Sequence, residues 1–281
     1  MASEKFLSKR ADPLLKLFVK KVKDQFNERV IAIFKIGSLG SHGDFSLCSD
    51  VDVVLMLDEI KASDYDAIQK LWEHIKTADI EYADRLSVFW SSYDKDAFEH
   101  GIGRFPPHDR LDFIRHGILM AGIDHRAELP QPEHKAIVLA SAEFITAFML
   151  AGEKIDKLTQ HPEKILAEGA RYFTKFVLFP VRLIFTLDYP GVIGSNKEAV
   201  EHFNKALVAI IPAAKEIVNL AYIIRNTPAD SPVLMEPEKL RLALIPLYDY
   251  CINRYKEATL ALGETKLSAQ LEAAHKRLRN A

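Results

Sequence analysis

Two aspartates separated by a single residue give the strongest chemical signal in this 281-residue sequence. Asp50 and Asp52 open the apolar run DVDVVLML, which is typical of a buried β-strand. Because side chains at positions i and i+2 of a strand point to the same face, the two carboxylates should lie side by side. Two such charges repel each other, and Mg²⁺ accepts paired carboxylates together with phosphate oxygens. The pair therefore predicts a magnesium site.

Eleven residues separate these aspartates from a Gly-Ser pair, Gly37 and Ser38, whose glycine ends the β-branched run VIAIFKIG. Gly37 would let backbone amides approach a phosphate closely, and Ser38 offers a hydroxyl donor. The alternative is an ordinary surface strand in which Asp50 caps a turn, because two acids flanking one residue are common. The upstream strand ending in Gly-Ser favours the phosphate and metal interpretation.

The segment IGSLGSHGDFSLCSDVDVVLM resembles the signature of the nucleotidyltransferase superfamily, which includes DNA polymerase β and the aminoglycoside nucleotidyltransferases. The resemblance implies that Gly37 and Ser38 contact nucleotide phosphates and that Asp50 and Asp52 hold one or two Mg²⁺ ions. Less specific similarity to the antibiotic-modifying members extends over residues 30–210. It implies a nucleoside triphosphate, ATP for an adenylyltransferase-like member, as co-substrate.

Members of this superfamily usually carry a third acidic residue on a later strand. By resemblance, Asp84 in the run YADRLSVFW is the candidate for this third catalytic and metal-binding carboxylate, with Glu81 in reserve. The alternative interpretation of Asp84 is a turn or strand-start aspartate. If neither acid reaches the metal, the site would be impaired.

Four charged residues in the second half are further candidates. Glu143 lies in an apolar run, where partial burial would raise its pKa and suit a general base; pairing with a neighbouring basic residue is the alternative. Lys175 and Arg182 are seven residues apart and share a helix face, where they could bind a phosphate or pair with acids. By resemblance, Lys197 is the candidate contact to the triphosphate, although Asn196 separates it from Ser195 where the family pattern is nearer Ser-Lys.

The elements that must position these residues differ between the two halves. The first half predicts, in order, a helix at 14–26, strands at 30–37 and 50–57, a helix at 64–76 and a strand within 81–90. The second half predicts helices at 133–151, 162–188, 196–210, 212–226 and 236–262, and a terminal one. We expect an α+β chain: a catalytic domain at 1–127 with a small sheet and flanking helices, then an all-α helical bundle at 128–281 for acceptor binding or dimerisation.

Composition limits the class of protein further. With 48% hydrophobic and 27% charged residues, the chain should be globular rather than disordered. A net charge of −2 without a basic stripe disfavours nucleic acid as a partner. The apolar run at 136–152 carries Glu143 at its middle, which opposes membrane insertion, so we expect a buried core helix and no membrane association. Cys48 and Cys251 form no disulfide framework and the chain start has no apolar signal core, which together suit the cytoplasm.

These observations favour a Mg²⁺-dependent nucleotidyltransferase that moves a nucleoside monophosphate to a hydroxyl of a small molecule, with an aminoglycoside-type antibiotic as one acceptor. The helical domain would cover the acceptor. A homodimer formed through this domain is an alternative that the sequence does not decide. One alternative is a nucleotide-binding regulatory protein of antitoxin-like type with weak or no turnover. Another is transfer to a protein or RNA acceptor.

Overall fold

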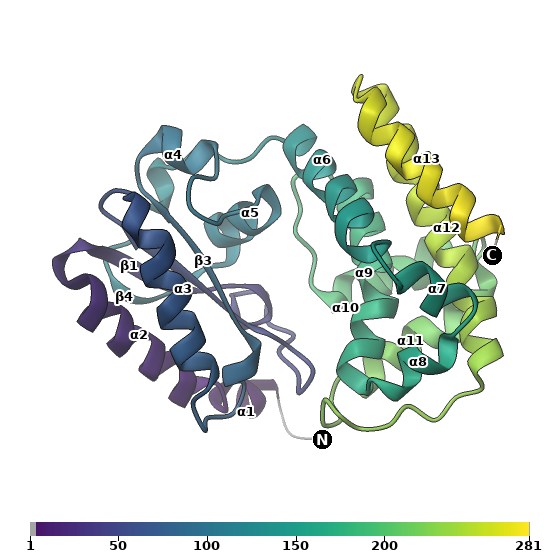
Figure 1. Cartoon of the computed structure of the whole chain (residues 1–281), viewed down its shortest axis with the longest axis horizontal. Helices are drawn as coiled ribbons and strands as arrows, with labels where there is room; N and C mark the ends of the chain where they lie inside the picture. Colours follow the sequence, from purple (N-terminus) through teal and green to yellow (C-terminus); the bar gives the residue numbers. More distant parts are fainter. Residues whose placement is uncertain (1–3, 281) are drawn as a thin grey trace. The chain divides into compact units, whose positions relative to one another are not determined.

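The computed structural model describes residues 4–280 and divides the chain into two compact units, Met1–Pro132 and Glu133–Ala281 (Figure 1). The first unit contains a small sheet with flanking helices, and the described part of the second is helical. The predicted α+β class, with an N-terminal sheet and a C-terminal helical bundle, is therefore confirmed. The domain limits expected from the sequence lie a few residues from the boundary between the units.

The first unit is built on a four-stranded sheet in the order β3-β2-β1-β4. The strands are β1 (Val30–Lys35), β2 (Val51–Leu57), β3 (Leu86–Ser92) and β4 (Ile118–Gly122). β1 runs antiparallel to β2 and β4, whereas β2 and β3 are parallel. The sequence predicted the first three strands and missed the edge strand β4, whose side chains are exposed or half-buried and show no buried apolar alternation.

Helices cover both faces of this sheet, and β2 lies between them. The first face packs under α2 (Asp12–Phe26) and α3 (Ala62–Lys76), with α1 (Glu4–Lys9) preceding them. The second face packs against α4 (Lys95–Glu99) and α5 (Pro107–His116). Alternate residues of β2 enter the two cores: Val51, Val53, Leu55 and Leu57 the first, and Val54 and Met56 the second. By this alternation, Asp52 projects on the α4/α5 side.

The second unit consists of helices around a continuous apolar core. They are α6 (His134–Phe144), α7 (Lys154–Thr159), α8 (Pro162–Ala167), α9 (Ala170–Asp188), α10 (Asn196–His202), α11 (Lys215–Ile224), α12 (Pro237–Ala261) and α13 (Thr265–Asn280). Two buried tyrosines of α12 fasten it to α9: Tyr248 and Tyr255 each donate a hydroxyl hydrogen bond of 2.8 Å to a backbone carbonyl of that helix. Because both hydroxyls are buried, these bonds fix the packing of the two helices.

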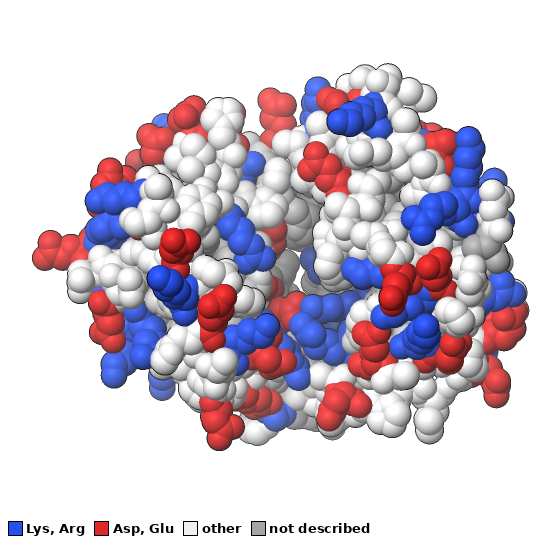
Figure 2. All heavy atoms as spheres, in the orientation of Figure 1, with Lys and Arg blue, Asp and Glu red and all other residues white. Residues whose placement is uncertain are grey.

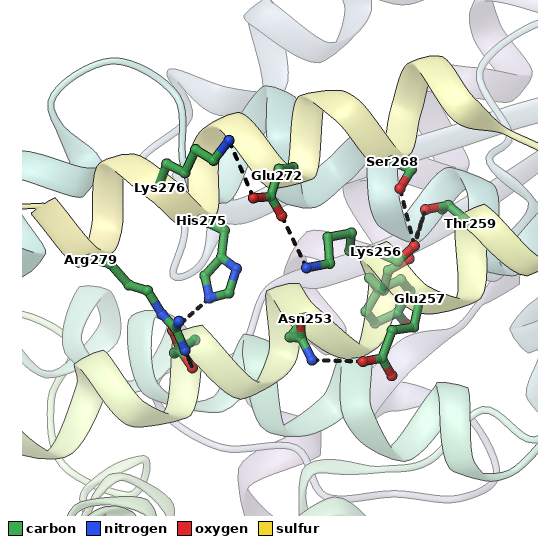
Figure 3. A network of polar contacts seen from close by, with 11 residues as sticks. Asn253, Lys256, Glu257, Thr259, Ser268, Glu272, His275, Lys276 and Arg279 are labelled. Atoms are coloured by element: carbon green, nitrogen blue, oxygen red, sulfur yellow. Dashed lines mark hydrogen bonds and ion pairs between the residues drawn. The ribbon is translucent and has the colours of Figure 1, made fainter.

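Charged pairs add to the packing of α12 against α13. Figure 3 shows Lys256 of α12 reaching Glu272 of α13, with a nitrogen–oxygen distance of 3.0 Å, while Lys276 approaches the same carboxylate. On the larger scale, basic and acidic side chains are interspersed on the face that Figure 2 presents, in keeping with the nearly balanced charge of the chain.

The helical expectations hold in outline, but several of the expected helices are interrupted. The run at 196–210 forms α10 followed by a π-helical turn, Phe203–Leu207. The helix expected at 162–188 is divided into α8 and α9, because Gly169 takes a positive φ of 88° between them. The run at 133–151 forms α6 followed by a π-helical turn, Ile145–Met149. Among the described residues, no helix is long and apolar enough to cross a membrane.

Candidate functional site

The Gly-Ser pair forms a tight turn directly after β1. The Ile36 N–H donates to the Asp52 carbonyl at 3.0 Å, so this turn begins beside β2. Gly37 takes a left-handed φ of 61°, a conformation that disfavours residues with a Cβ. A Cβ placed on Gly37 would lie 2.7 Å from Asp52 Oδ2. Glycine is therefore required here twice over, by its backbone angle and by the carboxylate packed against it.

The two predicted metal ligands belong to the start of β2. Asp50 immediately precedes the strand, Asp52 is its second residue, and both are half-buried. The carboxylates of Asp50 and Asp52 supply the hard oxygen ligands that Mg²⁺ prefers. Asp52 lies against Gly37, where the lack of a side chain leaves room for its carboxylate. Ser38, also half-buried, follows Gly37 in the same turn. The structure thus brings Gly37, Ser38 and Asp52 together, with Asp50 next to them in the chain.

A third carboxylate reaches this turn from a part of the chain that sequence analysis did not connect with it. Asp112 of α5 is 4% exposed and accepts a 2.6 Å hydrogen bond from the Gly37 N–H through Oδ2. On the other side of the same residue, His42 Nε2 lies 2.9 Å from the Gly37 carbonyl oxygen. Both backbone groups of Gly37 are therefore held by side chains.

Helix α5 is itself firmly anchored, which fixes Asp112. Buried Arg110 donates to the backbone carbonyls of Phe98 and Glu99, and burial lowers the pKa of its guanidinium. At the other end of the helix, Arg126 Nη1 donates to the carbonyls of Phe113 and Gly117. These contacts make the Asp112 carboxylate a positioned group.

Asp84, the predicted third acid, does not lie on β3 beside Asp52. It belongs to a short turn before β3, has an exposed side chain, and its Oδ1 lies 3.8 Å from Arg85 Nε. In the parallel register of β2 and β3, the residue paired with Asp52 is Ser87. Glu81, the reserve candidate, forms an ion pair with Arg10. Among the described residues, neither acid joins Asp50 and Asp52 in a compact ligand group.

The remaining predicted residues belong to the second unit. Glu143 is exposed on α6, so the expectation of partial burial is wrong: the buried residues of this helix occupy its other side. Lys175 and Arg182 are both half-buried on α9. Lys197 is exposed in the first turn of α10, and the preceding Ser195 caps that helix through a reciprocal pair of hydrogen bonds with Glu198. These four residues keep their proposed roles as predictions.

The chain shares its fold with a solved nucleotidyltransferase. The chain is similar over 87% of its length to the spectinomycin adenyltransferase AAD(9) from Enterococcus faecialis, solved with ATP and spectinomycin. The match covers 98% of that protein with a TM-score of 0.58 and 14% sequence identity. No family model and no curated protein matches the sequence. The resemblance seen in the Gly-Ser and Asp-x-Asp segment is therefore confirmed at the level of the fold.

Proposed function

We propose that the protein is a Mg²⁺-dependent nucleotidyltransferase that moves the nucleoside monophosphate of a triphosphate, ATP in the first instance, to a hydroxyl of a small molecule. The observation that carries the proposal is the left-handed Gly37 packed against the Asp52 carboxylate. Support comes also from the fold, which the chain shares with an adenyltransferase that was solved with ATP and spectinomycin.

The residues of the first unit would hold the triphosphate. The turn that Gly37 forms would place the Ser38 hydroxyl where it can donate to a phosphate oxygen, while the N–H and carbonyl of Gly37 are engaged by Asp112 and His42. Asp50 and Asp52 would hold Mg²⁺, which when bound neutralises the charge of the triphosphate and of the leaving pyrophosphate. Asp112 and His42 hold the two backbone groups of Gly37 and therefore act as positioning residues.

The transfer itself is an in-line displacement. The acceptor hydroxyl oxygen forms a bond to the α-phosphorus, the bond to the bridging oxygen of pyrophosphate breaks, and the hydroxyl proton passes to a carboxylate. Of the two candidates for that proton acceptor, the proposal favours Asp84, because it belongs to the unit that carries the aspartate pair, and Glu143, exposed on α6, is the alternative. Lys175, Arg182 and Lys197 are the candidate cations for phosphate or acceptor groups. By this proposal, the helical unit contributes the acceptor site.

One observation favours a second function. The residue beside Asp52 on β3 is Ser87, a hydroxyl where a third carboxylate was expected, and Asp84 is exposed outside the strand. A protein that binds a metal–nucleotide complex without transferring it would keep the Gly-Ser turn and the aspartate pair and have no need of a third acid. Such a protein would serve as a nucleotide-dependent regulator.

A transfer assay separates these functions. The full chain is incubated with α-labelled ATP, Mg²⁺ and a panel of hydroxylated acceptors containing spectinomycin, other aminocyclitols and aminoglycosides. Pyrophosphate release and a labelled acceptor are followed together. The proposed function predicts acceptor-dependent release that needs Mg²⁺. Binding of ATP without release for any acceptor of this panel would overturn it in favour of the nucleotide-binding regulator.

A further inference from the structure

A second group of potential metal-ligating side chains contacts the Gly37 turn. His42 comes from the loop between β1 and β2, and Asp112 and His116 come from successive turns of α5. One ligand atom from each residue lies within 4.8 Å of the other two. Among the described residues, this is the compact group of three that could hold a metal ion.

Two potential ligand atoms of this group are buried without a hydrogen-bond partner. Asp112 is 4% exposed; its Oδ2 accepts from the Gly37 N–H, whereas its Oδ1 makes no hydrogen bond and lies 3.7 Å from His42 Nε2. His42 Nδ1 is likewise buried without a partner. Leaving a buried carboxylate oxygen unsatisfied costs free energy, and such an atom calls for an explanation. A bound cation would satisfy the carboxylate oxygen.

We propose that His42, Asp112 and His116 form a binding site for a divalent transition metal ion of the Zn²⁺ class. Two imidazoles and one carboxylate suit a borderline ion, whereas Mg²⁺ prefers oxygen ligands alone. Three protein ligands leave a coordination position for water in a tetrahedral zinc site. This site is distinct in its ligands and in its metal from the one assigned to Asp50 and Asp52.

The surroundings already orient the ligands. The hydrogen bond from His42 Nε2 to the Gly37 carbonyl selects the tautomer in which Nδ1 keeps its lone pair. His116 Nδ1 lies 3.2 Å from the Ser41 hydroxyl, and the Ser41 N–H donates to the His116 carbonyl at 2.7 Å. Such contacts to the non-ligating atoms of a metal site fix ring orientation. The two rings stack with centroids 4.3 Å apart, which keeps their nitrogens together.

Small side-chain rotations would complete the coordination. In a tetrahedral zinc site with bonds of about 2.1 Å, ligand atoms lie about 3.4 Å apart. The observed limit of 4.8 Å is wider by an amount that rotation of the side chains can close. The ion would then cross-link the loop that carries Gly37 and Ser38 to α5. Its expected effect is to stabilise this loop, whether or not the protein turns over a nucleotide.

The test measures metal binding to the full chain after removal of metal by a chelator. Co²⁺ and Zn²⁺ are titrated by calorimetry, and Co²⁺ also by visible absorption, because tetrahedral Co²⁺ with nitrogen ligands absorbs far more strongly than octahedral Co²⁺ with oxygen ligands. The proposal predicts one intensely absorbing Co²⁺ per chain, displaced by Zn²⁺, and a higher Tm with Zn²⁺. These readouts do not depend on transfer activity, so they can fail or succeed independently of the proposed function.

Variants assign the signal to its ligands. His42→Gln and His116→Gln should each weaken Zn²⁺ at least about tenfold and abolish the intense Co²⁺ band. His100→Gln, an exposed histidine beside Asp96, is the matched control and should change neither. The Asp50→Asn/Asp52→Asn double variant should keep the band. Any of three results would overturn the proposal: no band in the wild type, a band that survives in both histidine variants, or a band lost in the double variant. Circular dichroism establishes that each variant is folded.

Discussion

The two units of the chain use charged residues in different ways. In the sheet unit, side chains from the loop between β1 and β2, from β2 and from α5 meet at Gly37, and hydrogen bonds between His42, Asp112 and the Gly37 backbone fix two of them. In the helical unit, helical periodicity buries apolar side chains along α9 and α12 and leaves the candidates Glu143 and Lys197 exposed. The contacts around Gly37 therefore indicate a site within the sheet unit alone. The exposed charges of the helical unit can be assigned to a site only by measuring activity.

The largest effect is expected at the aspartate pair of the sheet unit. Asp52→Asn removes a metal-binding charge packed against Gly37, so transfer should fall at least about 1,000-fold, equivalent to about 4 kcal/mol of activation free energy. Initial rates of pyrophosphate release measure it, with the Tm as a check on folding. Asp96→Asn is the matched control, because its side chain is exposed on α4 beside His100, and no comparable loss is expected. Turnover retained by Asp52→Asn, or an equal loss in Asp96→Asn, would contradict this assignment of the pair.

A glycine substitution made in both units sharpens the comparison. Gly37→Ala and Gly152→Ala impose a methyl group at nearly equal positive φ values of 61° and 57°. The backbone conformation alone should therefore cost each variant about 1 kcal/mol of unfolding free energy. Only at Gly37 does the methyl group meet a carboxylate, whereas nothing lies within 4 Å at Gly152. Calorimetry should show a loss of Mg²⁺–ATP affinity of at least about tenfold in Gly37→Ala alone. Equal affinities in the two variants would show that the Gly37 turn does not contact the nucleotide.

Within the sheet unit, substitution of a structural acid, Asp64, should lower stability rather than nucleotide affinity. Asp64 is 2% exposed and accepts two hydrogen bonds from Arg29, of 2.7 and 2.8 Å. Asp64→Asn should cost about 2 kcal/mol of unfolding free energy in urea titrations, with little change in nucleotide affinity. Asp58→Asn, which removes the exposed partner of the same guanidinium, should cost less than about 1 kcal/mol. Equal costs would show that burial of the pair does not matter.

The same variant has a defined pH dependence. Hydrogen bonding to Arg29 lowers the pKa of Asp64 below its ordinary value. The stabilisation is therefore fully present above the unfolded-state pKa, about 4, and is lost as the pH falls through the lower folded-state pKa. The difference in unfolding free energy between wild type and Asp64→Asn should be constant from pH 7 to about pH 5 and should shrink below about pH 4. A difference that grows on acidification would reverse the sign of this argument.

The smallest effect is expected in the helical unit. Glu143 has an exposed side chain on α6, so the partial burial expected of a general base at this position is absent. Glu143→Gln should therefore change kcat less than about threefold, because an essential general base contributes about 100-fold or more. A loss of that size, with the alkaline and acid limbs of the pH–rate profile altered, would instead establish Glu143 as the base and bring the helical unit into the chemistry.

The sequence predicted those features that depend on near neighbours in the chain. The Gly-Ser turn and the aspartate pair lie within one strand–loop–strand segment, so spacing and alternation were sufficient to place them. Asp112 contacts Gly37 across 75 residues of sequence, and no local pattern connects the two. The one available signal was the Asp112–His116 spacing of four residues, which puts both side chains on one face of a helix.

The errors have equally local causes. Glu143 is surrounded in sequence by apolar residues, yet an α-helix distributes neighbours around its axis, and this position faces solvent. Asp84 was placed by its approach to a strand, whereas the strand begins two residues later and offers Ser87 to Asp52. Burial and strand register are set by tertiary packing, so a single sequence could not fix either.

Calorimetric titration of ATP, with and without Mg²⁺, into the wild type and the Asp50→Asn/Asp52→Asn double variant tests the central claim most directly. The account predicts Mg²⁺-dependent binding to the wild type that weakens at least about 100-fold in the double variant, because the metal then loses both protein carboxylates. Without Mg²⁺ the double variant should bind ATP no worse than the wild type, since two negative charges have been removed. Equal ATP affinity with and without Mg²⁺, or undiminished Mg²⁺–ATP binding to the double variant, would contradict the assignment of this site.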